Sequence, residues 1–279
     1  MIIWLASYPK SGNTLTRSLL ASYFFSADGK FNFHQLKNIP QFPDISLFKR
    51  YGLNTKDEQE LLKNYVFVQK QINKKNSIQF LKTHSCLFNI NNNPFTNLNV
   101  SLGAIYIVRD PRNVLISAAH HYQSTQKKTA DYLVKGYNIG KYDGKEIVTY
   151  TGDWAFNYNS WKSFREVNKY LLIKYEDLIN DKEKSFYKIL EFIYAIKNID
   201  FVLDKKKFKN TLQSTDFQNM QKLENEGGFV EAITDEETGK KIKFFNLGKK
   251  TEWKKLLDPH LKSYIEKAFR KEMIELGYL

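Results

Sequence analysis

The chain begins with a turn whose residue types suit the binding of an anion. Residues 7–14 read Ser-Tyr-Pro-Lys-Ser-Gly-Asn-Thr and stand between the apolar run 2–6 and leucines at helical spacing. The backbone N–H groups of such a turn, at the start of a helix, can surround an anionic group, and Lys10 adds positive charge. Gly12 permits a close approach of the backbone to a ligand. The alternative is an ordinary Pro-Gly turn between a strand and a helix.

The position of the lysine indicates which kind of anion site this is. The loop that binds nucleoside triphosphates, G-x-x-x-x-G-K-[ST], needs its lysine directly after the second glycine and a hydroxyl next to it for magnesium. In this chain Lys10 precedes Gly12, and neither feature of that motif is present. The turn is therefore predicted to be P-loop-like, without the residues that a triphosphate and its metal require.

A second group suited to phosphate lies in residues 106–117. Arg109 ends an apolar run, and Asp110 with Pro111 is typical of a helix start. Ser117 follows about two helical turns later. An arginine and a hydroxyl in these places can close on one phosphate from two sides. The alternative is a helix start in which Arg109 makes only a structural salt bridge.

The elements that must position these groups are visible as an alternation of apolar runs and helical patterns. Buried parallel strands are predicted at 2–6, 78–81, 104–108 and 170–173, and helices at 57–74, 112–122, 153–167 and 181–194. This alternation predicts an α/β fold, a single domain over residues 1–279 with a central parallel sheet flanked by helices. Because such sheets bind ligands beyond the carboxyl ends of their strands, the polar residues after each run should converge on one edge.

Three other stretches complete the prediction of local structure. Residues 136–152 and 225–248 are predicted as long loops, which are usually functional or disordered. From Asp258 and Pro259 onward the pattern predicts a closing helix.

Composition limits the class of protein. The formal charge of +13 favours a polyanionic partner, such as a nucleotide, nucleic acid, acidic glycan or membrane surface, although the lysine runs 205–207 and 240–241 are expected to be solvated faces. Cys86, the single cysteine, excludes an intramolecular disulfide framework and a cysteine-rich zinc site. No apolar run approaches the length of a membrane span, and the first run is too short for a signal peptide. We therefore expect a soluble, cytoplasmic protein.

Together the two phosphate-binding stretches resemble the sulfotransferases that use 3′-phosphoadenosine 5′-phosphosulfate (PAPS). That family has a Y-P-K-S-G-x-T loop for the 5′-phosphosulfate and an arginine followed eight residues later by a serine for the 3′-phosphate. The resemblance continues at three further places in the same order: K-T-H at 82–84, Y-E-D at 175–177, and T-x-F-x-x-M at 215–220.

The resemblance implies a role for each of these residues. His84 would be the general base, and Lys10 and Lys82 would stabilise the transferring sulfonate and the leaving phosphate. The donor-binding residues that it implies are Ser11, Gly12, Asn13 and Thr14 at the 5′-phosphate, Arg109 and Ser117 at the 3′-phosphate, Leu15, Thr215 and Phe217 toward the adenine, and Tyr175 of the Y-E-D segment. PAPS would be the co-substrate, and the reaction would need no metal.

The chain also departs from the family pattern. Leu15 replaces a tryptophan that stacks on adenine, and the R-K-G-x-x-G-D-W-K element survives only as 246–254, without its leading basic pair. Gly248 with Lys249 or Lys250 could replace that pair at the 3′-phosphate, or both lysines could be solvated. The first strand starts at residue 2, without the preceding segment of the animal cytosolic members, and the family's dimer motif is absent, so the oligomeric state cannot be inferred.

Two other classes of function fit parts of the sequence. For a P-loop kinase, the chain lacks the required G-K-[ST]. A basic nucleic-acid-binding protein is supported only by charge and aromatic content, and we expect no nucleic-acid partner.

The acceptor could be a small molecule, a glycan or a lipid headgroup, attacking through a hydroxyl or an amine. His120 and His121, on the helix after Ser117, could line the acceptor side, but packing or a place on the surface is favoured. An apolar acceptor wall is possible at Phe31, Phe33, Phe42 and Phe48, with core packing at least equally favoured.

Overall fold

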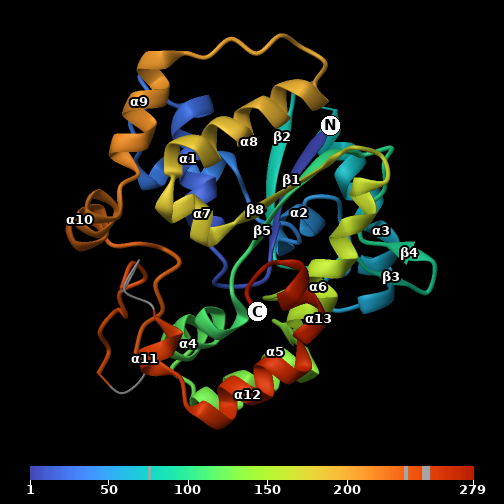
Figure 1. Ribbon diagram of the computed structural model, residues 1–279. Helices are drawn as coiled ribbons and strands as arrows, with labels where there is room; N and C mark the ends of the chain where they lie inside the picture. Colours follow the sequence, from blue (N-terminus) through green and yellow to red (C-terminus); the bar gives the residue numbers. More distant parts are fainter. Residues whose placement is uncertain (75–76, 236–237, 247–251) are drawn as a thin grey trace.

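A four-stranded parallel sheet forms the centre of the molecule (Figure 1). The computed structural model describes residues 1–279 except 75–76, 236–237 and 247–251. The strands follow the order β2-β1-β5-β8 across the sheet and comprise β1 (Ile2–Ser7), β2 (Gln79–Thr83), β5 (Ser101–Val108) and β8 (Tyr170–Lys174). The α/β fold predicted from the sequence is confirmed, and each predicted strand lies within or beside an observed one.

The apolar runs of the strands are continuous because helices cover both faces of the sheet. All six residues of β1 are buried. Alternate side chains of β1 point to opposite faces: Ile2, Trp4 and Ala6 pack in one apolar cluster and Ile3 and Leu5 in the other. A parallel strand that is buried on both faces has no polar side to interrupt its apolar pattern.

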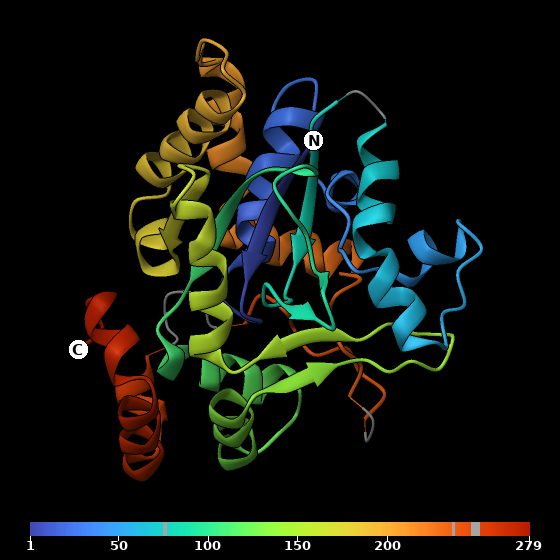
Figure 2. The ribbon, with the colours of Figure 1, turned by 90° about the vertical axis from the view of Figure 1, so that its right-hand side faces the viewer.

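Helices cover each face, as Figures 1 and 2 show. On one face lie α3 (Glu58–Asn73) and α6 (Trp154–Trp161), the latter extended by the 3-10 helix η2 (Lys162–Arg165). On the other lie α1 (Asn13–Phe25) and α8 (Lys182–Ile196). Aspartate side chains accept hydrogen bonds from the first-turn N–H groups of α3, α6, α8 and also α4 (Pro111–His121), which fixes where these helices begin: Asp57, Asp153, Asp181 and Asp110.

The other elements are short and surround this core. They comprise η1 (Phe33–Asn38), α2 (Ile45–Lys49), β3 (Asn89–Ile90), β4 (Asn93–Pro94), α5 (Gln126–Lys135), α7 (Tyr175–Asn180), α9 (Lys205–Ser214), α10 (Phe217–Gly227), α11 (Trp253–Leu256), α12 (Pro259–Ala268) and α13 (Arg270–Glu275). The closing helix begins where it was predicted, because the Asp258 carboxylate accepts hydrogen bonds from two backbone N–H groups of α12.

The stretch 136–152, predicted as a loop, contains a two-stranded antiparallel hairpin. Its strands are β6 (Tyr137–Ile139) and β7 (Thr149–Gly152). Glycines with positive φ stand at both ends of the hairpin, Gly136 at 78° and Gly152 at 67°. The strands are too short to show an alternating pattern, so the sequence, with its glycines, indicates a loop. The stretch 225–248, also predicted as a loop, begins with the last residues of α10, which ends at Gly227; beyond that point its described part has one isolated bridge, between Thr234 and Lys241.

The predicted binding residues lie at the point where the strand order changes direction, with β2 on one side of β1 and β5 on the other. β1 pairs with β2 on one side and with β5 on the other, and Ser7 lies opposite Ile107. The chain then leaves β1 toward α1 on one face and leaves β5 toward α4 on the opposite face. A crevice forms at such a point, beyond the carboxyl ends of the strands. The turn after β1 and the arginine after β5 therefore face each other across it.

Candidate active site

A cavity of about 1120 Å³ lies beyond the carboxyl ends of β1, β2 and β5. Ser11 is fully buried in the turn after β1 and is not part of the lining. The predictions at Gly248, Lys249 and Lys250 fall outside the described residues. The cavity brings together the other predicted site residues: Lys10, Gly12, Asn13, Thr14, Leu15, Lys82, His84, Arg109, Ser117, Tyr175, Thr215 and Phe217.

The turn between β1 and α1 has a tightly constrained backbone. Lys10 has a φ of 65° and Gly12 a φ of 102°, both in the left-handed region. A Cβ on Gly12 would lie 2.4 Å from Cδ2 of Tyr175, so only glycine fits there. The Asn13 side chain donates hydrogen bonds to the Leu5 carbonyl at 2.9 Å and to Ser7 Oγ at 3.2 Å. This amide fastens the turn to the strand, and it is therefore not available as a ligand.

Buried polar atoms at this turn fit an anionic ligand. Ser11 Oγ and Arg109 Nε are buried, and neither has a hydrogen-bond partner among the described residues. Gly12 caps α1 without a side-chain acceptor for its first N–H groups. Because a buried donor without a partner is costly, these groups together suit an anion that accepts several hydrogen bonds.

Two lysines bring positive charge to the cavity. Burial lowers the pKa of Lys10 to about 7; the Glu231 carboxylate raises it, and the charges of Arg109 and Lys82 lower it further. The Lys10 ammonium lies 3.9 Å from the centroid of the Phe244 ring. Burial also lowers the pKa of Lys82, against the raising effect of Glu231. An anionic ligand would favour the charged form of both lysines.

His84 follows β2 and is held in one orientation by β1. Its Nδ1 lies 2.9 Å from the Ser7 carbonyl oxygen and 3.3 Å from Ser7 Oγ. Because a carbonyl oxygen only accepts hydrogen bonds, Nδ1 carries the proton and Nε2 has the free lone pair. Burial, and next the charge of Lys82, lowers the pKa of His84 to about 3, so the ring is neutral. A neutral imidazole with one fixed N–H is arranged to accept a proton.

Asn157 supports His84 from the opposite side and was not predicted. Its side-chain amide donates to the His84 carbonyl at 3.0 Å and to the Thr151 carbonyl at 2.8 Å, and the Tyr106 hydroxyl donates to its Oδ1 at 2.8 Å. Asn157 is fully buried on α6. One side chain thus ties the backbone of His84 to the hairpin strand β7 and to β5.

Arg109 bridges the two phosphate-binding stretches. It is 5% exposed, donates from Nη1 to the Lys10 carbonyl at 3.0 Å, and its guanidinium lies 4.3 Å from the Tyr175 ring centroid. No carboxylate among the described residues pairs with it, which rules out a salt bridge within that part of the chain as its role. The salt bridge belongs instead to Arg112, which pairs with Asp110 at 2.7 Å.

Comparison with known proteins identifies the family. A family model described as the sulfotransferase domain matches residues 2–277. The chain belongs to this family. It is 25% identical over 221 residues to the luciferin sulfotransferase of Photinus pyralis, covering 78% of this chain and 56% of that protein. It is 28% identical over 174 residues to sulfotransferase 2A6 of Mus musculus, covering 61% of this chain and 56% of that protein. With sulfotransferase 1A1 of Bos taurus included, the chain spans between 56 and 64% of the length of these relatives.

Solved structures show the same fold. The mouse sulfotransferase SULT7A1 complexed with PAP aligns with a TM-score of 0.60 and 21% identity, covering 98% of this chain and 84% of that one. A retinol dehydratase in complex with androsterone and the inactive cofactor PAP aligns with a TM-score of 0.61 and 17% identity, covering 98% of this chain and 80% of that one.

The predicted adenine side of this sulfotransferase domain is more open than the phosphate side. Phe217, the first residue of α10, is 39% exposed and lines the cavity, as does Leu15 on α1. Thr215 also lines it, but its hydroxyl donates to the Thr211 carbonyl at 2.7 Å. Tyr175 lies between Gly12 and Arg109. Of the residues predicted at the adenine, the aromatic ones are Tyr175 and Phe217, and the cavity is also lined by Tyr122, Phe244 and Phe245.

Residues on either side of 247–251 in the sequence contact α4, the helix that carries Ser117. On one side the Asn246 amide nitrogen lies 3.1 Å from Nε2 of His120. On the other side the Trp253 backbone N–H donates to Asn113 Oδ1 at 3.0 Å. His120 and His121 both line the cavity, and His121 packs edge-on to Phe244 with ring centroids 5.5 Å apart.

Glu231 is the main residue of the cavity that the sequence did not predict. Its Oε2 accepts a hydrogen bond from Thr14 Oγ1 at 3.1 Å, and its Oε1 lies 3.2 Å from the Lys82 ammonium and 2.5 Å from Arg17 Nη1. The charges of Lys82 and Arg17 outweigh the effect of burial, which alone would raise the pKa of this carboxyl, and lower it to about 2. No local pattern around Glu231 marks it, because its partners lie far away in the chain.

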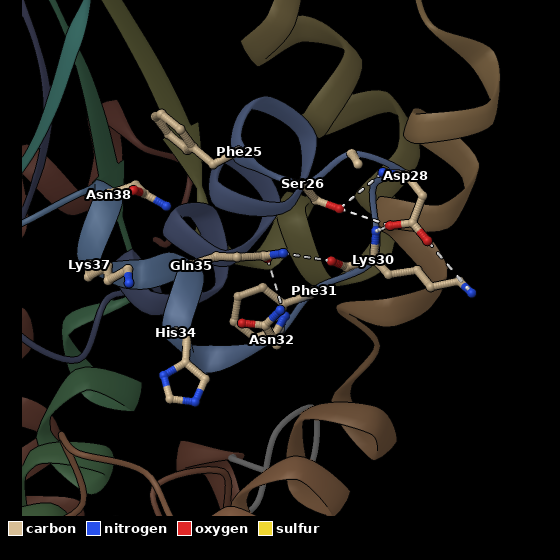
Figure 3. Close-up of a pocket in the computed structure, with 11 residues that line it drawn as sticks. Phe25, Ser26, Asp28, Lys30, Phe31, Asn32, His34, Gln35, Lys37 and Asn38 are labelled. Atoms are coloured by element: carbon tan, nitrogen blue, oxygen red, sulfur yellow. Dashed lines mark hydrogen bonds and ion pairs between the residues drawn. The ribbon is translucent and has the colours of Figure 1, made fainter.

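The phenylalanines considered as an acceptor wall do not line the cavity. Phe42 and Phe48 are fully buried in the core, and Phe33 packs on Phe229 with centroids 4.6 Å apart. Phe31 borders a separate open hollow of about 520 Å³ near η1 (Figure 3). There, Ser26 donates to Asp28 and Gln35 donates to the Lys30 carbonyl, so these polar groups are satisfied locally.

Two features are absent from the part of the chain that the structure describes. No group of three or more His, Cys, Asp or Glu side chains in that part of the chain is placed to hold a metal ion. No helix found there combines the length and the apolar character needed to cross a membrane.

Proposed function

We propose that this protein transfers the sulfuryl group from PAPS to a small-molecule acceptor. The observation that carries the proposal is the meeting of Lys10, Lys82, His84 and Arg109 on one cavity, although they come from the carboxyl ends of three different strands. Membership of the sulfotransferase family and the likeness of the fold to PAP complexes support the same donor.

The phosphate groups of the donor would be held by two sets of residues. At the 5′-phosphate, the backbone N–H groups at the start of α1 and Ser11 Oγ donate, while Lys10 and Lys82 supply charge. At the 3′-phosphate, the free N–H groups of Arg109 and the Ser117 hydroxyl bind. Asn13 and Thr14 take part through their backbone, because their side chains are already bonded to Leu5, Ser7 and Glu231.

His84 would act as the general base. As the acceptor oxygen forms its bond to sulfur, its proton passes to Nε2 of His84, whose Nδ1–H stays on the Ser7 carbonyl. The bond between sulfur and the bridging oxygen breaks, and that oxygen keeps the electron pair as PAP forms. Lys10 and Lys82 stabilise the charge that develops there, which is the largest contribution expected of such a site.

The acceptor would enter past His84, between α4 and the hairpin. This side of the cavity is lined by Gln41, Tyr122, Ile139 and Thr149. One relative is named for luciferin and another, from Cavia porcellus, for 3-beta-hydroxysteroids. We therefore place a small molecule with a hydroxyl group first, ahead of an amine, a glycan or a lipid headgroup.

The proposal is tested with PAPS labelled in its sulfur. The protein is incubated with labelled PAPS and a cell-metabolite extract, and label in a new product is identified by mass spectrometry. Lys10→Ala should lower both PAP affinity and turnover, while His84→Ala should lower turnover sharply and leave PAP affinity nearly unchanged. If the protein does not bind PAP but turns over ATP in a magnesium-dependent reaction, the proposal is overturned in favour of a kinase.

A further inference from the structure

We propose that Glu231 is a positioning residue of the donor site, whose carboxylate holds the Lys82 ammonium and the Thr14 hydroxyl in place. This inference rests on the proposed function. Glu231 lies between α10 and α11, in a segment found at the same end of the sheet as α4 (Figure 1). Its two carboxylate oxygens meet three groups from α1 and β2: Thr14 at 3.1 Å, Arg17 at 2.5 Å and Lys82 at 3.2 Å.

Arg17 fixes the carboxylate and makes it a permanent part of the site. Arg17 is 7% exposed, and two of its nitrogens donate to backbone carbonyls, Nε to Ile39 at 2.7 Å and Nη2 to Leu36 at 3.0 Å. A buried guanidinium needs a counter-charge, and Glu231 is the carboxylate that pairs with it within the described part of the chain. The position of Glu231 is therefore set by a cation that is itself anchored to the backbone.

The packing on both sides of Glu231 also determines where it points. Phe229 is 1% exposed and packs on Phe33 and on Phe244, at centroid distances of 4.6 and 4.9 Å. Earlier in the chain, Glu224 accepts a hydrogen bond from the backbone N–H of Phe244 at 2.6 Å. Val230, between Phe229 and Glu231, is 91% exposed. The alternation of buried Phe229, exposed Val230 and inward Glu231 turns the carboxylate into the cavity.

The surroundings of Lys82 determine how Glu231 affects its pKa. Its side chain is 8% exposed, and burial favours the neutral amine, whereas the adjacent carboxylate favours the ammonium. Without the charge of Glu231, Lys82 would face further cations and lose its proton at a lower pH. The charged and titratable groups that act on Lys82, or on which it acts, are Glu231, Arg17, Lys10, His84 and His121.

The test measures the affinity for PAP by calorimetry from pH 6 to pH 10, which needs no acceptor. For Glu231→Gln, we expect the pH at which PAP affinity begins to fall to move lower by about one unit, so that at pH 9 the variant binds roughly tenfold more weakly than the wild type. The matched control is Glu226→Gln, because Glu226 lies nearby on α10 and pairs with the exposed Lys222. This control should follow the wild-type profile.

A double variant separates positioning from mere support of the fold. In a Lys82→Met background, Glu231→Gln should shift the pH profile much less, because the ammonium that Glu231 contacts directly is gone and only its effect on Lys10 remains. Glu231→Asp keeps the counter-charge of Arg17 and shortens the side chain by one methylene, so it should shift the profile in the same direction by about half as much.

The outcomes distinguish this inference from the proposed function. If the wild type binds PAP and Glu231→Gln lowers the affinity equally at every pH, or not at all, the positioning role is wrong while the function stands. A shift of undiminished size in the Lys82→Met background would overturn the positioning role as well. Absence of PAP binding by the wild type would overturn the proposed function and this inference together.

Discussion

Two buried histidines should make the folded protein sensitive to mild acid. The pKa of His84 is lowered to about 3 by burial and next by Lys82, and that of His121 to about 3 by burial and next by Lys10. In the unfolded chain a histidine titrates near pH 6.5. Below that pH the unfolded state binds more protons than the folded state, so the free energy of unfolding decreases as the pH falls toward 3.

The size of the effect follows from the two pKa values. Between pH 6 and pH 5 an unfolded histidine gains protons while a folded one with a pKa near 3 stays neutral, which lowers the free energy of unfolding by about 1.2 kcal/mol for each residue. His84 and His121 together should therefore lower it by about 2.4 kcal/mol. Globular proteins have a total stability of about 5–15 kcal/mol, so this loss is easily measured.

The assay is urea unfolding followed by tryptophan fluorescence at pH 6 and pH 5. Trp4, Trp154 and Trp161 are buried and report the loss of the core. His84→Gln and His121→Gln should each remove about half of the difference between the two pH values. His34→Gln, at an exposed histidine of η1, is the control and should keep the full difference. A difference that is the same in the wild type and both buried variants would refute the reasoning.

Three further outcomes are expected. Gly12→Ala should lower stability and PAP affinity more than Gly52→Ala in unfolding and binding assays. Both glycines have positive φ, where an alanine costs about 1–2 kcal/mol, but only at Gly12 would the new Cβ clash with Tyr175. Equal losses in the two variants would contradict the role of the clash. Leu15→Trp should tighten PAP binding by roughly 1 kcal/mol if adenine stacks there, and no gain in calorimetry would place adenine elsewhere. Addition of PAP should raise the pKa of His84 in an NMR titration, and an unchanged pKa would show that the ligand's charge does not reach the ring.

The four strands of the central sheet could be predicted because burial on both faces leaves its mark within a few neighbouring residues. β1 shows this most clearly, since none of its six side chains reaches solvent. The hairpin β6–β7 could not be predicted, because three- and four-residue strands do not establish a period of two. Helix starts were predicted within a residue or two where an aspartate caps the first turn, as Asp110 and Asp258 do.

The same contrast between local and distant information applies to the site. The turn around Gly12 and the pair Arg109 and Ser117 are short patterns whose spacing reflects one turn and one helix. Glu231 has its partners Thr14 and Lys82 at separations of 217 and 149 residues, and no local spacing can record such a contact. Asn157 was missed for the same reason, since it meets His84 across 73 residues.

The arrangement of charge around His84 contains a conflict that the proposed donor resolves. In the proposed site Lys10 and Lys82 hold the anion, yet burial, together with the charges of these lysines, lowers the pKa of His84 to about 3 and makes it a weak base. The negative charge of a bound donor acts on the same lysines and on the ring, and it opposes the effect of the lysine charges. His84 would then become an effective base only beside a bound donor, because the charge that activates it arrives with the sulfuryl group that the reaction consumes. Cations next to a buried, neutral base are therefore consistent with proton removal that follows donor binding.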